Sequence, residues 1–276
     1  MNVFRSDGTP LAGVDALFLD LDGVVYRGRA RIPHAVEVIR RVAEALPVLY
    51  LTNNASRTPE EVARRLREFG LAAGPDDIVA SPHVVVDLLR SSVPTGSRIL
   101  VVGGQGLVDA IRSAGFVPVS RASESPDAVV QGFDRSVCWP DLAEACLALA
   151  PRGRASEIPW VASNGDLSLP VEGGNVPGNG ALVLAVRVVV GRDPVFAGKP
   201  ERGMFDLACA RVGARAPLVV GDRLDTDIAG ARRAGLRSAL VLTGITTRRD
   251  VAAAPVDRQP DFIFEDLRDL FGTSAT

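Results

Sequence analysis

Short apolar runs that do not alternate with polar residues constrain this chain more than any other feature of its sequence. A strand with one face in water would alternate, so uninterrupted runs bounded by turn residues indicate strands buried on both faces of a parallel sheet. These runs occupy residues 16–19, 48–51, 98–102, 128–131, 160–162, 218–220, 238–242 and 262–264. Helical patterns separate them, over residues 33–46, 59–69, 82–89, 106–114, 140–149, 179–190, 201–212 and 226–234. The alternation predicts an α/β fold built on parallel sheet.

The composition is that of ordinary folded domains. With 276 residues, 47% of them hydrophobic, the chain is long enough for one large domain or two moderate ones. A formal net charge of −2 gives the chain no overall positive charge for nucleic-acid binding, and no run reaches the roughly 18 apolar residues of a membrane span. The N-terminus lacks the pattern of a signal peptide. We therefore expect a cytoplasmic protein with neither nucleic acid nor membrane as a partner, and leave a homodimer open.

The cysteines give no sign of a disulfide framework or a zinc site. Cys138, Cys146 and Cys209 form no CxxC pair, and their odd number leaves one without a mate. We expect them to pack in the core instead.

Two aspartates follow the first apolar run. Asp20 comes directly after residues 16–19, and Asp22 follows one residue later, with Gly23 free to turn the chain. Open α/β sheets bind ligands beyond the carboxyl ends of their strands, where these side chains are expected. One acid can face a substrate while the other handles protons, and Mg²⁺ takes carboxylate oxygens together with a substrate phosphate. A solvated turn at a strand end would also fit an isolated motif of this kind.

The same arrangement recurs after two further runs. Residues 52–56, Thr-Asn-Asn-Ala-Ser, place a hydroxyl and short amides where the oxygens of a phosphate would need donors. Asp222 follows residues 218–220 and is a natural metal ligand at a strand end. Asp227, in the first turn of the next helix, could orient a ligand or metal-bound water. Asp225 is expected to do no more than cap that helix.

One lysine stands apart from the other cations. Of the 31 basic residues only Lys199 is lysine, in a Gly-Lys-Pro sequence at the entrance to a predicted helix. Arginine is a wide planar fork, whereas lysine is a compact point charge on a thin stem, so a site that needs the latter does not accept the exchange. We expect Lys199 to neutralise a phosphoryl group and the crowded carboxylates; the alternative is survival of this lysine by chance.

These motifs divide the chain into a core and an insertion. They occur before about residue 60 and after about residue 195, so the middle of the chain carries none of them. We predict a core of residues 1–81 and 192–276 and a smaller inserted α/β domain of residues 82–191. The hinges are expected near Ser81-Pro82 and within residues 190–197.

In their order along the chain, the motifs resemble those of haloacid-dehalogenase superfamily phosphatases: DLDGV from Asp20, LTNNAS from Leu51, GKP from Gly198 and GDRLDTDI from Gly221. The insertion is similar to the α/β cap of the NagD-like, p-nitrophenyl phosphatase subfamily, with residues 130–134 and 177–181 resembling signatures of that cap. The resemblance covers nearly the whole chain and implies a Rossmann-like core with the cap inserted. Within this subfamily, the sequence as a whole is most similar to the bacterial glycerol-3-phosphate phosphatase branch.

The resemblance implies a Mg²⁺-dependent phosphomonoester hydrolase. Asp20 would be the nucleophile that is transiently phosphorylated, and a carboxylate is already ionised at neutral pH without an activating base. Asp22 would protonate the leaving alcohol and later deprotonate water. Mg²⁺ would be bound by Asp20, the backbone carbonyl of Asp22 and Asp222, with Asp227 supporting this metal site. The phosphoryl group would be held by Thr52, Asn53, Asn54 and Lys199.

The implied substrate is a small phosphate ester, glycerol 3-phosphate first and phosphoglycolate second. From the cap we expect contacts by Asn164, Asp166, Gly178 and Gly180. Nucleoside monophosphates, pyridoxal phosphate and sugar phosphates remain alternatives. A phosphomutase, a receiver-like module and a phospho-ligand-binding module fit less well, because receivers are shorter and lack a DxD pair, and a binding module needs no intact set of acids.

Overall fold

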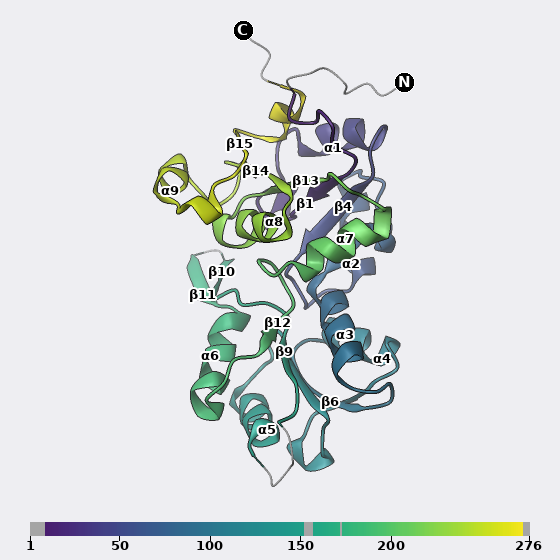
Figure 1. The fold of residues 1–276 in the computed structure, drawn as a ribbon, viewed down its shortest axis with the longest axis vertical. Helices are drawn as coiled ribbons and strands as arrows, with labels where there is room; N and C mark the ends of the chain where they lie inside the picture. Colours follow the sequence, from purple (N-terminus) through teal and green to yellow (C-terminus); the bar gives the residue numbers. More distant parts are fainter. Residues whose placement is uncertain (1–8, 152–156, 172, 273–276) are drawn as a thin grey trace. The chain divides into compact units, whose positions relative to one another are not determined.

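The computed structural model describes residues 9–272 except 152–156 and 172. Within these residues the chain divides into two compact units (Figure 1). The first unit runs to Thr52, resumes over Pro59–Val79 and continues from Lys199 onward. The second contains Asn53–Thr58 and Ala80–Gly198. No helix in the described part of the chain is long and apolar enough to cross a membrane.

A six-stranded sheet forms the centre of the first unit, in the order β15-β14-β13-β1-β4-β5. Neighbours from β15 to β4 all pair in parallel. The strands span Leu17–Leu19 (β1), Val48–Thr52 (β4), Ile78–Ala80 (β5), Leu218–Gly221 (β13), Arg237–Val241 (β14) and Phe262–Phe264 (β15). The side chains of β1 are fully buried, and burying each such Leu or Phe stabilises the fold by roughly 1.5–3 kcal/mol. The prediction of parallel strands buried on both faces is confirmed for β1 and β13, whereas Ile263 in the edge strand β15 is exposed.

Helices with one apolar face pack around this sheet. In α1, the apolar residues at positions 35, 36, 38, 39 and 42 are buried along one face, and the charged residues at 37, 40 and 41 face water. Pro59 opens α2, where its missing N–H costs no hydrogen bond, and two glutamates follow in the first turn. The helices of this unit span Ala35–Ala43 (α1), Pro59–Glu68 (α2), Gly203–Val212 (α7), Ala229–Ala234 (α8) and Arg248–Ala253 (α9).

The second unit is built on a five-stranded parallel sheet of its own, in the order β12-β9-β8-β6-β7. Its strands span Arg98–Val102 (β6), Val117–Val119 (β7), Ala128–Gln131 (β8), Trp160–Ala162 (β9) and Val195–Phe196 (β12). Helix α3 packs beside α4 and α5 beside α6, and the two pairs flank the strands in Figure 1. These helices span Ser81–Ser92 (α3), Gln105–Ser113 (α4), Trp139–Leu149 (α5) and Asn179–Val190 (α6). Each unit is therefore an α/β layer structure with its own core.

Several short elements were not predicted from the sequence. Two short antiparallel hairpins, β2–β3 (Tyr26–Arg27 and Ala30–Arg31) and β10–β11 (Ser168–Val171 and Gly174–Pro177), have no continuous apolar run to reveal them. Strand β12 lies in residues predicted as a hinge. Because β12 pairs with β9, the second unit continues to Gly198 and does not stop at residue 191.

Three local predictions need correction. Cys138 is exposed, so core packing is wrong for this cysteine, while Cys146 and Cys209 are half-buried. The helix expected from residue 226 begins as a π-helical turn over Leu224–Ile228, which α8 continues. The helix expected from residue 201 begins at Gly203.

Candidate active site

Three neighbouring strands of the first unit end at polar side chains. Asp20 follows β1, Thr52 is the last residue of β4, and Asp222 follows β13. Because β1 pairs in parallel with both other strands, the three carboxyl ends lie at one edge of the sheet. The fold therefore brings together residues that are far apart in the sequence.

A cluster of carboxylates forms at this edge. Asp20, Asp222 and Asp227 each offer an oxygen, and these oxygens lie within 4.8 Å of one another. Burial raises the pKa of Asp20 well above its ordinary range, and Lys199 only partly opposes this effect. Burial, with the charge of Asp227 adding to it, raises the pKa of Asp222 to about 7. Buried carboxylates this close together favour a bound cation, because a positive charge would offset their repulsion.

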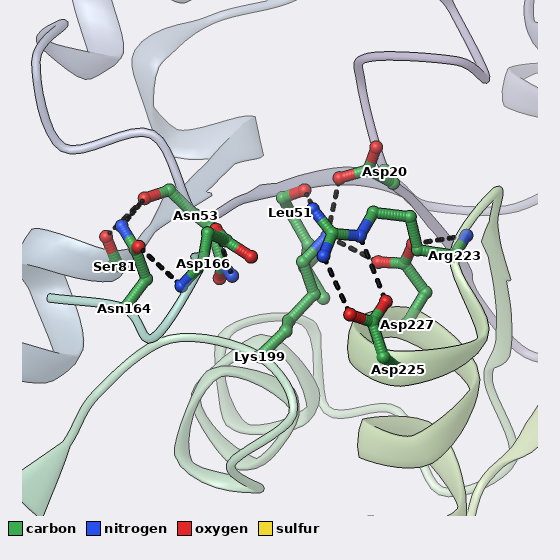
Figure 2. Close-up of polar contacts among 10 residues, drawn as sticks. All are labelled: Asp20, Leu51, Asn53, Ser81, Asn164, Asp166, Lys199, Arg223, Asp225 and Asp227. Carbon is green, nitrogen blue, oxygen red and sulfur yellow. Dashed lines mark hydrogen bonds and ion pairs between the residues drawn. The ribbon is translucent and has the colours of Figure 1, made fainter. Parts of the chain in front are cut away.

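Lys199 lies against two of these carboxylates. Its Nζ donates to Asp20 Oδ1, to Asp227 Oδ1 at 2.6 Å and to the Leu51 carbonyl at 3.2 Å (Figure 2). An ammonium group has three N–H donors, so these contacts use all of them. Burial lowers the pKa of Lys199, but Asp20 and Asp227 more than offset that effect and hold the pKa above its ordinary value. The lysine is therefore charged at neutral pH.

Asp227 is fixed from both sides of its carboxylate. One oxygen accepts from Lys199, and the other accepts from the backbone N–H of Arg223 at 3.1 Å. The residue lies in the π-helical turn, a conformation often found at functional sites. Asp225 points elsewhere, because its carboxylate receives two hydrogen bonds from the Arg223 side chain at 3.0 and 2.8 Å. Its expected capping role is replaced by this ion pair.

A loop after β14 supports Asp222, and none of the sequence motifs predicted this contact. The Ile245 N–H donates to Asp222 Oδ2 at 3.0 Å, and Thr246 Oγ1 donates to the Asp222 carbonyl. Thr243 Oγ1 donates to the Gly23 carbonyl at 2.6 Å, which links the loop to the turn after Asp20. Only its position in the sequence could have indicated this loop, because Thr-Gly-Ile-Thr directly follows a predicted strand, as the recognised motifs do.

Gly23 and Asp22 form the turn beyond Asp20. Gly23 has a φ of 89°, and a Cβ there would lie 2.5 Å from Asp222 Cγ. No larger residue fits, so the glycine after the acidic pair is explained by the close approach of Asp222. The side chain of Asp22 is exposed and is not part of the carboxylate cluster found among the described residues. The two aspartates of the first motif thus have different surroundings.

Comparison with known proteins identifies the family. A haloacid dehalogenase-like hydrolase model matches residues 17–117, and a HAD-hydrolase-like model matches residues 196–270. The D-glycerol 3-phosphate phosphatase of Mycobacterium tuberculosis is 45% identical over 256 residues, which cover 93% of this chain and 70% of the relative. The chain belongs to the haloacid dehalogenase-like hydrolases.

Two further matches of this haloacid dehalogenase-like hydrolase are also phosphatases. A crystal structure of glycerol phosphate phosphatase from Mycobacterium tuberculosis in complex with magnesium has a TM-score of 0.88 at 43% identity, covering 95% of this chain and 78% of that one. An acid sugar phosphatase of Staphylococcus aureus is 36% identical over 257 residues, which cover 92% of this chain and 95% of the relative. The predictions of the family, of the α/β fold class and of a phosphatase are confirmed.

The remaining predicted site residues of this hydrolase belong to the second unit. Asn53 and Asn54 directly follow Thr52, but they group with the second unit. The Asn54 side chain is exposed, and its Oδ1 accepts from the N–H and the hydroxyl of Ser56 at 2.9 and 2.7 Å. Asn164 and Asp166 each form a hydrogen bond with Asn53.

Proposed function

We propose that this hydrolase cleaves small phosphomonoesters through a phosphorylated Asp20. One observation carries the proposal: the only lysine of the chain bridges Asp20 and Asp227 at the carboxyl edge of the core sheet, beside Asp222. A buried cation next to a carboxylate is suited to hold a phosphoryl group while that carboxylate attacks it.

Mg²⁺ fits the donors of this site. It prefers carboxylate and carbonyl oxygens, and a bound cation would offset the repulsion among the three clustered carboxylates. We assign its binding to Asp20, Asp222 and the backbone carbonyl of Asp22, with Asp227 supporting the site through Lys199 and the Arg223 N–H. When bound, the ion offsets the repulsion between the attacking carboxylate and the phosphate.

The first chemical step joins Asp20 to the substrate. One oxygen of its carboxylate forms a bond to phosphorus, and the bond from phosphorus to the ester oxygen breaks. Asp22, exposed in the adjoining turn, gives its proton to the departing alcohol. Thr52, Asn53, Asn54 and Lys199 hold the phosphoryl oxygens, with Asn54 acting through its backbone N–H because its side chain binds Ser56.

The second step regenerates the enzyme. Asp22, now a carboxylate, takes a proton from water, whose oxygen bonds to phosphorus as the acyl phosphate bond breaks. Inorganic phosphate leaves, and the carboxylate of Asp20 is restored. The two aspartates of the first motif are thus assigned different chemistry in both half-reactions.

Removal of divalent metal should lower kcat/KM by at least about 100-fold. Mg²⁺ should restore the activity and raise the thermal unfolding temperature of the metal-free protein, because it binds only the folded state. Ca²⁺ should inhibit, since the larger ion accepts bidentate carboxylates and could take both oxygens of Asp20. Full activity in excess EDTA would contradict the metal assignment.

We propose glycerol 3-phosphate as the preferred substrate, followed by phosphoglycolate. The support is the 45% identity to a relative named D-glycerol 3-phosphate phosphatase. Sugar phosphates are the alternative substrate class, because the similar staphylococcal proteins are named acid sugar phosphatases. The predicted cytoplasmic location and the homodimer stay predictions.

In a panel of esters assayed with Mg²⁺, glycerol 3-phosphate should exceed nucleoside monophosphates in kcat/KM by at least about tenfold. The measurement is phosphate release at several substrate concentrations, with p-nitrophenyl phosphate as the reference ester. A clear preference for nucleoside monophosphates would contradict the ranking, and a preference for sugar phosphates would support the alternative substrate class.

A further inference from the structure

Asn53 is held by three side chains of the second unit. Asn164 Nδ2 donates to the Asn53 carbonyl at 2.8 Å, and Ser81 Oγ donates to the same oxygen at 3.0 Å. The Asn53 side chain donates through Nδ2 to Asp166 Oδ2 at 3.1 Å (Figure 2). Both the backbone and the side chain of Asn53 are therefore fixed.

The segment that carries Asn164 and Asp166 is itself rigidly supported. Asn164 Oδ1 accepts from the Asp166 N–H at 3.2 Å, which closes the segment on itself. The fully buried Asn179, first residue of α6, donates from Nδ2 to the Asn164 carbonyl at 2.7 Å. The Gly180 N–H donates to the Asp166 carbonyl at 2.9 Å. A residue held in this way can position another residue accurately.

Gly178 and Gly180 are explained by the same packing. A Cβ at Gly178 would lie 2.3 Å from the Asp166 carbonyl oxygen, and one at Gly180 would lie 2.3 Å from that of Gly165. These glycines let the start of α6 approach the backbone of residues 165–166. Gly198 also lies against Asn53, because a Cβ at Gly198 would lie 2.5 Å from Asn53 Oδ1.

These contacts have a consequence for the backbone after Asn53. A trans peptide is planar, and its N–H points opposite to its carbonyl. The two donors that bind the Asn53 carbonyl therefore also set the direction of the Asn54 N–H. In the proposed function this N–H is a donor to the phosphoryl group.

We propose that Asp166 and Asn164 are positioning residues, which orient Asn53 and the Asn54 N–H for phosphoryl binding and do not contact the organic part of the substrate. The inference rests on the proposed function, because that function assigns phosphoryl binding to residues 53 and 54. It replaces the direct substrate contacts expected for Asn164, Asp166, Gly178 and Gly180. A positioning role predicts the same loss for every phosphate ester, whereas a substrate contact predicts a loss that depends on the leaving group.

The test compares Asp166→Ala with Asp166→Asn. For each protein we would measure KM for glycerol 3-phosphate and for p-nitrophenyl phosphate, and the inhibition constant of inorganic phosphate. Asp166→Ala should raise all three by a common factor of about ten, because one hydrogen bond to a carboxylate is lost. Asp166→Asn should stay within about twofold of the wild type, since its amide oxygen still accepts from Asn53. Ser81→Ala should give the same uniform pattern with a smaller factor, about threefold.

A double-mutant cycle tests whether Asp166 acts through Asn53. In an Asn53→Ala background, Asp166→Ala should add less than about a twofold change. The matched control is Asp193→Ala, another aspartate of the second unit, whose exposed side chain pairs with Arg187. It should change none of the three constants. Thermal unfolding would show that each variant is folded at the assay temperature.

Two outcomes would overturn the inference alone. One is a loss confined to a single ester with an unchanged phosphate inhibition constant, and the other is an undiminished effect of Asp166→Ala in the Asn53→Ala background. If the wild-type protein neither cleaves the esters nor binds phosphate, the proposed function fails as well. The wild-type measurement therefore separates the two failures.

Discussion

Asp20→Asn should form no phosphorylated enzyme and should lose kcat/KM by about 10⁴-fold or more. An amide is neutral and a poor nucleophile, so the bond to phosphorus does not form. The change preserves the shape of a side chain that lies against Lys199. The activity would be measured as phosphate release. Phosphorylation would be measured as the mass of the intact protein after rapid quenching.

Asp22→Asn should behave differently, because its proposed role is proton transfer. Such a group typically accelerates a step by about 10²- to 10⁴-fold, and both half-reactions need it. With p-nitrophenyl phosphate the leaving group departs unprotonated, so the first step needs less help than the second. A phosphorylated protein should therefore accumulate in Asp22→Asn and not in the wild type, and hydroxylamine should release the phosphoryl group as it does from acyl phosphates.

A surface aspartate provides the control for this pair. Asp206 lies in α7 with a half-exposed side chain that pairs with Arg202, and it is not part of the carboxylate cluster. Asp206→Asn should keep wild-type kinetics within about twofold. A phosphoryl group trapped by Asp20→Asn, or mapped to Asp22 or Asp222, would show that the roles are wrongly assigned.

The residues at the carboxyl edge of the first unit's sheet could be predicted because each is marked by its immediate sequence neighbours. Each of Asp20, Thr52 and Asp222 stands at the end of an apolar run, and parallel pairing of those runs places their ends at one edge. Lys199 was found by a different route, as the only lysine in a chain that otherwise uses arginine. Neither argument requires knowledge of which side chains touch.

Contacts between distant residues could not be predicted in this way. The hydrogen bond from Asn164 to Asn53 joins residues 111 positions apart, and neither residue has a local pattern that names its partner. Thr246 likewise reaches Asp222 only because β14 pairs with β13. Strand β12 is too short to form an apolar run, so only its pairing with β9 identifies it as a strand. Tertiary pairing, more than propensity, decides these features.

Replacement of Lys199, the only lysine of the sequence, should also lower activity strongly. Lys199 is only 3% exposed to solvent, and its ammonium group donates three hydrogen bonds. A guanidinium is wider and planar, so it cannot bring donors to Asp20, Asp227 and the Leu51 carbonyl from one point. The same charge would therefore be present in the wrong place.

Lys199→Arg should lower kcat/KM by at least about tenfold, a loss of roughly 1.4 kcal/mol in transition-state stabilisation. Lys199→Met removes the charge and should cost on the order of 10³-fold, as loss of a buried transition-state donor does. Removing the cation also leaves Asp20 and Asp227 without their shared partner, so thermal unfolding must show that both variants are folded during the assay. Arg233→Lys is the reverse exchange at an exposed pair with Glu201 and should leave kinetics unchanged. Wild-type kinetics in folded Lys199→Arg would mean that this lysine survived by chance, because an arginine would then serve equally well at the one position where the chain has kept a different cation.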